Sequence, residues 1–550
     1  MRRTRVRFAP SPTGPLHMGG VRTALYNYLY AKQHGGDFIL RIEDTDSNRF
    51  VPGAEQYIIE ALNWCGIVPD EGVDAAGNVV ETPSKRHPHA PYRQSQRRNI
   101  YRKYAEQLVA SGNAYYAFDS AEDLELMRSR AENAGQTFIY NYSTRGGMCN
   151  SLTLDAEQTA RLLEERDDWT IRFKMPEDRT VAMDDLIRGH MEVNTSTLDD
   201  KVLWKKADEL PTYHLANIVD DHLMEITEVI RGEEWLPSLP LHWLLYEAFG
   251  WTDTMPRFAH LPLLLKPVGN GKLSKRDGDK MGFPVFPLEW TSPDGEKSHG
   301  YREDGYFPEA FVNMLAMLGW NPGTEQEIFS MQQLIDAFSL EKVGKSGAKF
   351  NPEKARWYNR EYLRMRSDSE LAELFMPLLR KKGVEAEPVF VEKLIGLIKE
   401  RATFVADFWD IASCIFVAPE KFKDHGIKAG AAFEKPATGR PADPRAKVYD
   451  DSATEPFLAK DADKFWKEEY WRAAKDALEH CEAGEIEDYV RSKGLPLGKV
   501  MNCLRLALTG AASGLGIADI ISFIGRDEAL SRMEFAIRRL GTVFAIESVE

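Results

Sequence analysis

Residues 5–32 read RVRFAPSPTGPLHMGGVRTALYNYLYAK, and this stretch decides the fold of the first part of the chain. Residues 4–8 alternate as a strand does, and from Met18 apolar side chains recur at helical spacing until Gly35 and Gly36 stop the helix. An ordinary strand-to-helix turn needs about two to six residues. This turn is longer and is made of Pro, Ser, Thr, Gly and His, so we expect a ligand to lie against it.

The segment that follows, DFILRIEDTD (37–46), predicts a second strand that ends in acidic residues. Strand, helix and strand in this order predict a βαβ unit and a parallel sheet. Ligands of such sheets bind outside the carboxyl ends of the strands, and both polar clusters, APSPTG and EDTD, fall at that edge. Apolar strand material resumes at residue 213, and HLMEITEVIRG (222–232) is expected to form another strand that ends near Arg231.

The rest of the chain changes character twice. Residues from about 96 to 200 indicate an insertion with its own sheet, and helical periodicity dominates from about residue 325. Asn351 is expected to cap a helix with Pro352 at its first position. Residues 419–457 are rich in proline and indicate a loop or linker.

Size and charge bound the possible functions. A chain of 550 residues predicts several domains of about 100 to 200 residues each. No apolar signal region and no run of about 18 apolar residues is visible, so we expect a cytosolic, cytoplasmic protein with no membrane partner. The net charge of −15 lowers the expectation of a nucleic-acid partner, although 93–103 and 272–276 are locally basic.

The cysteines are widely separated, with no C-x-C or C-x-x-C pair. This spacing argues against a disulfide framework and against a cysteine-rich zinc site, and buried reduced thiols are expected. They are Cys65, Cys149, Cys414, Cys481 and Cys503.

The residue types of the first turn suit a nucleotide. A helix N-terminus offers free N–H groups and partial positive charge to phosphate, and His17 lies there as a donor. Gly19 lets a flat ring approach the backbone. The alternative interpretation is a proline-rich loop with a chance histidine.

A second cluster, GNGKLSKRDGD (269–279), places Lys272, Ser274 and Lys275 on a glycine-rich loop. Two lysines on a mobile loop can follow charge onto a leaving pyrophosphate, and stabilising charge that develops in a transition state is often the largest catalytic effect. The alternative interpretation is a solvated basic turn.

Together, P-S-P-T-G-x-x-H-x-G and K-L-S-K-R resemble the paired signatures of class I aminoacyl-tRNA synthetases. The flanking stretches RIEDTD, PYRQSQR, PTYHLANIVDDHLMEITEVIRGEEW and KFNPEKARWYN make the chain similar to bacterial-type glutamyl-tRNA synthetases, most firmly over residues 5–360. Gly20 stands where the general class I signature has its second histidine.

The resemblance implies a multidomain α/β plus all-α fold: a Rossmann-type parallel-sheet catalytic domain with an α+β acceptor-stem insertion, and a helical C-terminal anticodon-binding half. The implied boundaries are 1–92 with 201–265 for the split catalytic domain, 93–200 for the insertion, 266–345 for the lysine loop and stem-contact region, 346–420 and 461–550 for two helical anticodon-binding domains, and 421–460 for a linker or insertion.

The resemblance also implies a glutamate–tRNA ligase activity. ATP, bound with Mg²⁺, would activate L-glutamate to glutamyl-adenylate, and the glutamyl group would pass to the 3′-terminal adenosine of tRNA(Glu) in protein synthesis. The chain is expected to be a monomer. Many members carry a zinc-binding C-x-C where residues 115–119 read YYAFD, so no structural zinc is expected and no metal-binding residue is assigned.

Site residues are carried over by position. The catalytic group comprises His17, Lys272 and Lys275. The ATP-binding group comprises Thr13, His17, Gly19, Gly20, Glu234, Trp235, Lys272, Ser274 and Lys275. The glutamate-binding group comprises Arg7, Ser11, Glu43, Tyr213, Asn217 and Arg231.

These types agree with the chemistry of glutamate, because arginine forks suit its carboxylates and an acid suits its ammonium. Arg231 is expected to read the side chain. Glutamine is isosteric, and it would leave the buried guanidinium without a counter-charge at a cost of about 3 to 5 kcal/mol.

Four other classes compete with this interpretation. A nucleotidyltransferase of the same superfamily would be shorter, and the truncated relative that glutamylates queuosine in tRNA would lack the C-terminal half. A glutaminyl-tRNA synthetase usually has P-E-P where this chain has APSPTG. A catalytically dead tRNA-binding protein would be expected to have lost His17 or Lys275. The sequence leaves open whether tRNA(Gln) is also charged, and the roles of residues 280–305 and 419–457.

Overall fold

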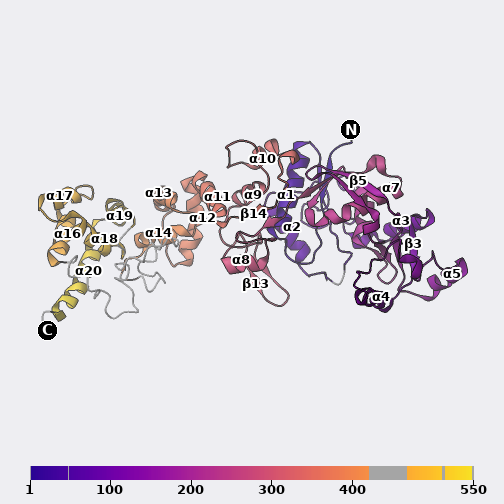
Figure 1. The fold of residues 1–550 in the computed structure, drawn as a ribbon. Coiled ribbons are helices and arrows are strands. Elements are labelled where there is room, and N and C mark those ends of the chain that lie inside the picture. The colour runs from indigo at the N-terminus through magenta and orange to yellow at the C-terminus, as the bar shows by residue number, and fades with distance from the viewer. Residues whose placement is uncertain (1, 47–48, 420, 422–466, 511–513, 548–550) are drawn as a thin grey trace. The chain divides into compact units, whose positions relative to one another are not determined.

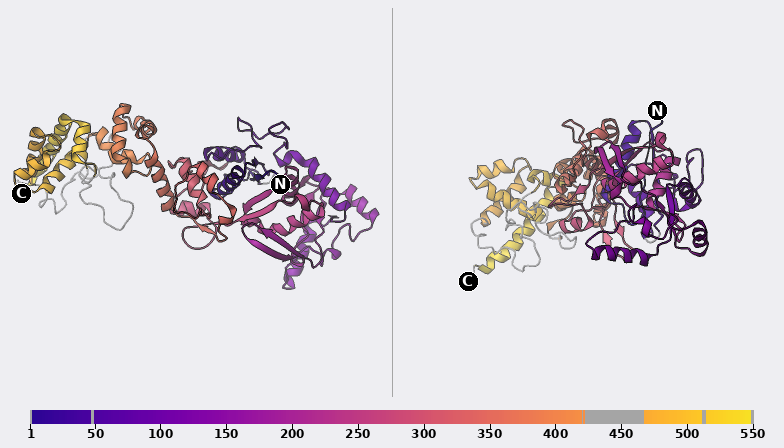
Figure 2. Two further views of the ribbon diagram at one scale, coloured as in Figure 1. Left: turned by 90° about the horizontal axis from the view of Figure 1, so that it is seen from above. Right: turned by 45° about the vertical axis from the view of Figure 1, so that its right-hand side comes forward.

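The computed structural model describes residues 2–46, 49–419, 421, 467–510 and 514–547 (Figure 1). The chain divides into two compact units, Met1–Tyr358 and Asn359–Glu550. The first contains the sheets, and the second is helical where it is described (Figures 1 and 2). This division agrees with the predicted α/β and all-α parts, whereas the finer domain boundaries stay predictions.

The opening strand, helix and strand form as the sequence predicts. Strand β1 (Arg5–Phe8) precedes helix α1 (Met18–Gln33), and β2 (Asp37–Leu40) returns parallel to β1. Gly36 permits this return, because a Cβ there would lie 2.3 Å from the backbone oxygen of Thr4. The βαβ unit is therefore confirmed.

A second sheet extends this core in the order β6-β5-β10-β9. Its strands are β5 (Thr180–Asp185), β6 (Gly189–Asn194), β9 (Glu228–Gly232) and β10 (Arg257–Leu261). Strand β10 runs parallel to both β9 and β5 and sets Arg231 opposite His260. The amide of Thr227 donates to the carbonyl of Arg5 at 2.9 Å, which brings the start of β9 beside β1.

The segment predicted as an insertion contributes two strands, β3 (Ala114–Ala117) and β4 (Thr170–Phe173), to a separate antiparallel sheet. The other two strands of this sheet, β7 (Val202–Lys205) and β8 (Leu210–Pro211), lie beyond the predicted boundary at residue 200. The helices of the insertion are α3 (Arg98–Ala110), α4 (Ala121–Asn133) and α5 (Ala156–Glu165). Strands β5 and β6 lie in the same sequence range but join the sheet of β9 and β10.

Residues 115–119, where many relatives are expected to carry cysteines, begin in strand β3. Tyr115 and Ala117 pack with Tyr140 and Met148 in one buried apolar cluster. The hydroxyl of Tyr115 donates to Asp200 at 2.6 Å. Side-chain packing therefore fills the interior of the insertion at this point.

The expectation of a strand beginning at residue 213 is wrong. Residues Tyr213–Leu223 form helix α6, and the strand β9 begins only at Glu228. The buried residues Leu215, Ala216, Ile218 and Val219 follow helical spacing. The β-branched pair at 218 and 219 favours a strand locally, and packing of this helix against its neighbours overrides that preference.

The remaining elements of the first unit connect these sheets. They are α2 (Ala54–Trp64), η2 (Gln94–Arg97), η3 (Arg145–Gly147), η4 (Thr195–Thr197), η5 (Glu233–Ser238), α7 (Leu239–Ala248), η6 (Thr252–Thr254), β11 (Leu264–Leu265), α8 (Lys275–Met281), β12 (Trp290–Thr291), β13 (Lys297–Ser298), α9 (Pro308–Ala316), α10 (Met331–Ala337), η7 (Leu340–Lys342) and β14 (Ala348–Lys349).

The predicted helical periodicity is confirmed in the last third of the chain. Helix α11 (Pro352–Met365) begins after Asn351, whose side chain accepts from the amide of Glu353 at 3.0 Å, as expected of a cap. The helices that follow are α12 (Asp368–Lys381), α13 (Pro388–Ile398), η8 (Lys399–Arg401), α14 (Asp407–Phe416), α16 (Glu468–His480), α17 (Ile486–Ser492), α18 (Leu497–Thr509), α19 (Ile517–Ile524) and α20 (Arg526–Glu547).

The structure leaves one prediction untested and corrects another. The proline-rich stretch 419–457 lies outside the described residues apart from Pro419 and Lys421. All five cysteines are free thiols, but Cys149 and Cys481 are half-buried rather than buried.

A buried ion cluster joins strands β1 and β2 to helix α6 and to the start of the insertion. It comprises Arg7, Arg41, Glu43, Arg97, Asp220 and Asp221. Asp221 accepts from Arg7 Nε at 2.9 Å and from Arg41 Nη1 at 2.8 Å. Its neighbour Asp220 accepts from Arg97 Nε at 2.7 Å. Three cations and three anions balance in this cluster.

The charges of this cluster depend on one another. Burial by itself would raise the pKa of Asp221, but the nearby charges of Arg7 and Arg41 outweigh it and hold that pKa below its usual value. Arg41 is completely buried, and burial alone would favour its neutral form. The charges of Asp221, Asp220 and Glu43 reverse this and raise its pKa.

Replacing Asp221 by Asn should destabilise the first unit strongly. The substitution keeps the shape but leaves Arg7 and Arg41 without their shared carboxylate, and breaking a buried ion pair costs about 3 to 5 kcal/mol. Urea unfolding followed by circular dichroism measures the loss. As a control, Glu106→Gln removes the exposed partner of Arg102 on helix α3 and should leave the midpoint unchanged. A loss below about 1 kcal/mol for Asp221→Asn would contradict the importance of the cluster.

Candidate functional site

The turn between β1 and α1 lines a cavity of about 560 Å³, here called the larger cavity. Its histidine caps the helix, because His17 Nδ1 accepts from the amide of Gly19 at 3.1 Å. The proton of the neutral ring must therefore sit on Nε2. That atom is buried and has no partner among the described residues. His17 thus lines the larger cavity with an N–H group that has no partner in the part of the chain that the structure describes.

The charge state of His17 follows from its surroundings. Burial lowers its pKa to about 4, and the ammonium of Lys272 contributes in the same direction. The ring is therefore neutral at neutral pH. It can donate one hydrogen bond, and it does not act as a cation.

Two glycines of the same helix line this cavity, for different reasons. A Cβ on Gly20 would lie 2.6 Å from Leu16 Cδ1, so the Leu16 side chain would have to shift to admit the second histidine of the general signature. A Cβ on Gly19 would meet nothing closer than 3.6 Å. The backbone there is open to the cavity, which Thr13 also lines.

The lysine loop folds back on itself after β11. Leu265 forms a β-bridge with Lys272, and Gly269 and Gly271 adopt positive φ angles of 80° and 112° that allow the turn. Lys272 lines the larger cavity, and its Nζ lies 3.4 Å from Glu234 Oε1, which lines it from the other side. The two segments predicted to share a pocket therefore do so.

Ser274 and Lys275 are not among the residues that line the larger cavity. Ser274 precedes helix α8, and its hydroxyl donates to Asp277 at 2.6 Å. Lys275 Nζ contacts Glu296 Oε1 at 2.8 Å. Of the two lysines expected at the ligand, Lys272 lines the larger cavity and Lys275 does not.

Glu296 belongs to the stretch 280–305, to which the sequence assigned no role. This stretch packs on the turn between β1 and α1. The carbonyl of Val285 accepts from the amide of Met18 at 2.9 Å, and Phe286 contacts His17 edge to face with 6.0 Å between ring centroids. The hydroxyl of Tyr57 on α2 donates to the carbonyl of Leu288 at 2.6 Å. Phe286 also lines the larger cavity, and no sequence signal indicated it.

A smaller cavity of about 240 Å³ adjoins the larger one, because both share Ser11, Gly20, Thr23, Gly232 and Glu234. All the residues predicted to bind glutamate line it: Arg7, Ser11, Glu43, Tyr213, Asn217 and Arg231. Trp235, predicted at the nucleotide, lines this smaller cavity instead and packs against Tyr213 in a tilted arrangement with 4.1 Å between ring centroids.

Arg7 and Glu43 reach this cavity from the buried ion cluster. Two nitrogens of Arg7, Nε and Nη2, contact Asp221. Glu43 Oε1 accepts from Arg41 Nη2 at 3.0 Å. Burial raises the pKa of Glu43, while Arg41 and Arg7 oppose that effect. In the amide orientation that satisfies both of its polar atoms, Asn217 donates to Asp221 and accepts from Arg7.

Arg231 differs from Arg7 in its partners. Its Nε donates to His260 Nε2 at 3.0 Å, and its Nη1 donates to the Tyr213 hydroxyl at 2.9 Å and lies 3.2 Å from His242 Nδ1. Within the described part of the chain, no carboxylate oxygen lies within 4.0 Å of its guanidinium nitrogens. The sequence indicated Arg231 but neither histidine, because only the fold brings strand β10 and helix α7 against it.

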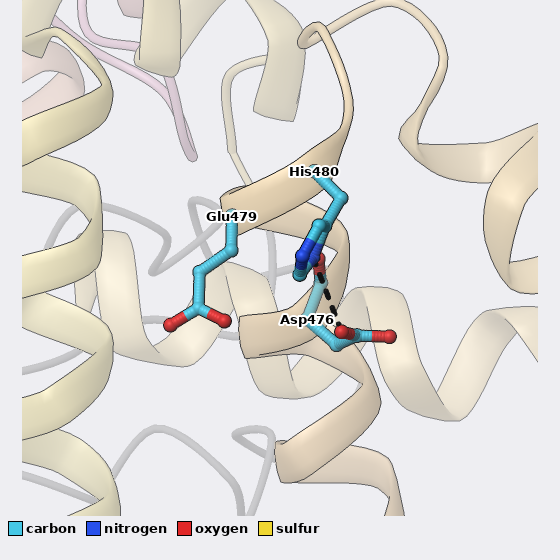
Figure 3. Close-up of side chains that lie close together, drawn as sticks. All are labelled: Asp476, Glu479 and His480. Carbon is cyan, nitrogen blue, oxygen red and sulfur yellow. Dashed lines mark hydrogen bonds and ion pairs between the residues drawn. The ribbon is translucent and has the colours of Figure 1, made fainter.

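Among the described residues, one group of three side chains lies close enough together to hold a metal ion: Asp476, Glu479 and His480 (Figure 3). These side chains lie at the end of helix α16 and are largely solvated. His480 Nδ1 already contacts Asp476 at 3.2 Å, and Glu479 contacts Lys475 at 3.4 Å. The group is accounted for as a surface ion-pair cluster.

Of the helices that the structure describes, none has the length and apolar character needed to cross a bilayer.

Comparison with known proteins assigns the family. The model for "tRNA synthetases class I (E and Q), catalytic domain" matches residues 3–357, and that for "Anticodon binding domain" matches residues 370–537. Proteins named glutamate–tRNA ligase from Christiangramia forsetii and Porphyromonas gingivalis are 52% and 53% identical, and each alignment covers 98% of this chain and 99% of the relative.

Solved structures give the same result. A glutamate tRNA ligase from Elizabethkingia meningosepticum, crystallised in complex with its amino acid, is 49% identical with a TM-score of 0.85 and covers 98% of this chain and 99% of that one. A glutamate–tRNA synthetase from Elizabethkingia anophelis is 48% identical with a TM-score of 0.83, covering 98% and 100%. With both signature segments on one cavity and both family models matched in order, this chain belongs to the class I tRNA synthetases of the E and Q group.

Proposed function

We propose that this protein is a glutamate–tRNA ligase. The α-carboxylate oxygen of glutamate attacks the α-phosphorus of ATP, pyrophosphate leaves, and glutamyl-adenylate remains. The 2′-hydroxyl of the terminal adenosine of tRNA(Glu) then attacks the acyl carbon, the ester forms, and AMP and the hydroxyl proton are released. No side chain acts as nucleophile, so positioning and charge stabilisation carry the reaction.

The observation that carries this proposal is the pairing of the two cavities. The smaller cavity contains a buried guanidinium, Arg231, for which the described chain supplies no carboxylate, and its wall at Ser11 and Glu234 is shared with the cavity that His17 and Lys272 line. The side-chain carboxylate of an acidic amino acid in the smaller cavity would neutralise the charge of Arg231. Its reacting end would then face a nucleotide in the larger cavity.

The other residues that line the smaller cavity can also contact a bound glutamate. Arg41 Nη2 donates to Oε1 of Glu43, which leaves Oε2 for the substrate ammonium. Arg7 Nη1 is available for a carboxylate, since its other two nitrogens bind Asp221. Trp235 and Tyr213 pack against each other and form an aromatic wall.

The lysines would act on the leaving pyrophosphate. Lys272 already lines the larger cavity, and its contact with Glu234 is at 3.4 Å and solvent-exposed. Lys275 must exchange Glu296 for a phosphate oxygen, which the glycine-flanked loop permits. Such exposed pairs are worth about 0 to 1 kcal/mol and do not obstruct the exchange.

Mg²⁺ is proposed to arrive with ATP. Glu234 is the only carboxylate among the described residues that line the larger cavity. Resident Mg²⁺ sites usually combine one or two carboxylates with substrate phosphates. The set present here therefore fits an ion carried mainly by the triphosphate.

For the macromolecular partner, the inserted segment 93–200 is proposed to bind the acceptor stem and the helical second unit the anticodon, through shape, stacking and base-edge contacts. The predicted domain boundaries, a monomeric state and a cytoplasmic location remain part of this proposal. The family match over both units supports the two tRNA-binding parts.

The proposed function is tested by esterification of labelled glutamate and glutamine onto purified tRNA(Glu) and tRNA(Gln) with ATP. Glutamate should be attached at least about a hundredfold more efficiently than glutamine, because an amide leaves Arg231 unpaired. Arg231→Gln should lose this preference. Arg257→Gln, on the exposed face of the neighbouring strand, should keep it. Glutamine use within tenfold of glutamate by the unmodified enzyme would refute the proposal.

Replacing His17 by Asn tests the neutral donor. Asn still caps helix α1 but lacks the Nε2–H group, so kcat/KM for ATP in tRNA-supported pyrophosphate exchange should fall by about a hundredfold. His34→Ala, at the other end of α1, serves as the control.

The pH dependence follows from the lowered pKa of about 4. The ratio of wild-type to His17→Asn activity should stay level from about pH 6 to 8, because the ring is neutral throughout. A cationic histidine would instead make this ratio decline above about pH 6.5, and that result would contradict the assignment.

The lowered pKa of His17 also affects the stability of the fold. The stability that His17 contributes is complete above about pH 6.5 and is lost as the pH falls toward 4.

A further inference from the structure

The partners of Arg231 are unusual among the buried arginines that the structure describes. Most of these arginines have a carboxylate partner: Arg5, Arg7, Arg41, Arg97, Arg145 and Arg532. Arg22 and Arg231 do not. Arg22 donates to the backbone carbonyls of Leu318 and Pro262. Arg231 donates to two imidazole rings, to the Tyr213 hydroxyl and, at 3.5 Å, to the carbonyl of Trp235.

The first imidazole, His260, has a fixed tautomer. Arg231 has only N–H donors, so His260 Nε2 must accept its bond and the ring proton must be on Nδ1. That proton is donated to Asp185 Oδ2 at 2.6 Å. Both side chains of this pair are fully buried. Burial lowers the pKa of His260 more than Asp185 raises it, and Arg231 adds to the lowering, so the ring is neutral.

The second imidazole, His242, repeats this arrangement on the other side of the guanidinium. Its Nδ1 lies 3.2 Å from Arg231 Nη1, and its Nε2 lies 3.2 Å from His214 Nδ1. A donor at Arg231 again requires an accepting Nδ1, so Nε2 carries the proton that His214 accepts. Protonation of His242 would place a second cation against Arg231, and burial together with the charge of Arg231 lowers its pKa well below the usual value.

We infer that His242 and His260 are positioning residues that set the specificity of this site by holding Arg231 with neutral acceptors. A carboxylate would hold the guanidinium equally well, as Asp221 holds Arg7, but it would also neutralise it. With imidazoles, the guanidinium is fixed in place and its charge is left for the substrate. This inference rests on the proposed function, in which the substrate side chain is a carboxylate.

The matched variants His242→Gln and His242→Glu test this inference in the full-length enzyme with tRNA present. Both side chains offer an acceptor to Arg231, and they differ chiefly in charge. His242→Gln should keep KM for glutamate and the glutamate-to-glutamine ratio of kcat/KM within about fivefold of wild type. His242→Glu should raise KM for glutamate at least about a hundredfold, reduce that ratio at least tenfold, and leave KM for ATP unchanged.

A single-atom change provides an independent test that avoids adding a buried charge. Asp185 Oδ1 accepts from the amides of Ile187 and Arg188, while Oδ2 faces His260. Asn at this position would keep its oxygen on those amides and present its NH₂ to His260 Nδ1. The ring proton would then move to Nε2, and the acceptor for Arg231 would be lost. Asp185→Asn should raise KM for glutamate at least tenfold with little change in kcat or in the melting temperature.

The outcomes separate this inference from the proposed function. If wild-type enzyme does not esterify glutamate, the proposed function fails. If wild type does so but the His242 variants are equally impaired toward glutamate and glutamine, His242 is merely structural and the inference fails. Should the His242→Glu protein not fold, Asp185→Asn decides alone, and an unchanged KM for glutamate in that variant overturns the inference.

Discussion

Asp221 bonds two arginines at once, and the arrangement of the site depends on this contact. Through Arg7 it holds strand β1, and through Arg41 it holds strand β2 and the carboxylate of Glu43. Its neighbour Asp220 binds Arg97, Gln94 and Tyr101 at the start of the insertion. Removal of Asp220 or Asp221 would leave a buried arginine without that counter-charge, which is far costlier than losing a surface pair. The cluster therefore fixes where the smaller cavity lies and which polar atoms line it.

Two arginines in one cavity serve different purposes because their partners differ. The charge of Arg7 is balanced by Asp221. Arg7 can therefore orient a ligand through the two N–H bonds of Nη1 without presenting an unbalanced charge. Arg231 is held by His242 and His260 and is not balanced, so its charge is available to a ligand. Discrimination between isosteric side chains needs this difference, because shape cannot separate a carboxylate from an amide. The matched family is described by the letters E and Q, which stand for glutamate and glutamine. These are the two side chains that such a site has to distinguish.

The sequence predicts what local pattern and motif spacing determine. The strand, turn and helix at residues 5–33 and the cap at Asn351 follow from it. The gathering of Arg7, Glu43 and Arg231 at one cavity was instead implied by the family resemblance. The structure corrects the expectation that strand material resumes at residue 213, because packing decides between helix and strand for a short apolar run. The strand expected to end near Arg231 does form, as β9. The structure also places Lys275 on Glu296 and Trp235 at the smaller cavity. Asp221, His242 and His260 could not be found from the sequence, since each acquires its role only through contacts with distant elements. The match of full-length relatives at about 50% identity excludes a truncated enzyme without the helical half.

The most direct test of the central claim is a crystal structure of this protein with tRNA, glutamate and a non-hydrolysable ATP analogue. The side-chain carboxylate of glutamate should lie within about 3.2 Å of the Arg231 guanidinium nitrogens, with His242 and His260 still in contact with them. Lys275 should have left Glu296 for the triphosphate. A glutamate side chain bound elsewhere, with Arg231 still lacking a carboxylate, would contradict the role assigned to its charge.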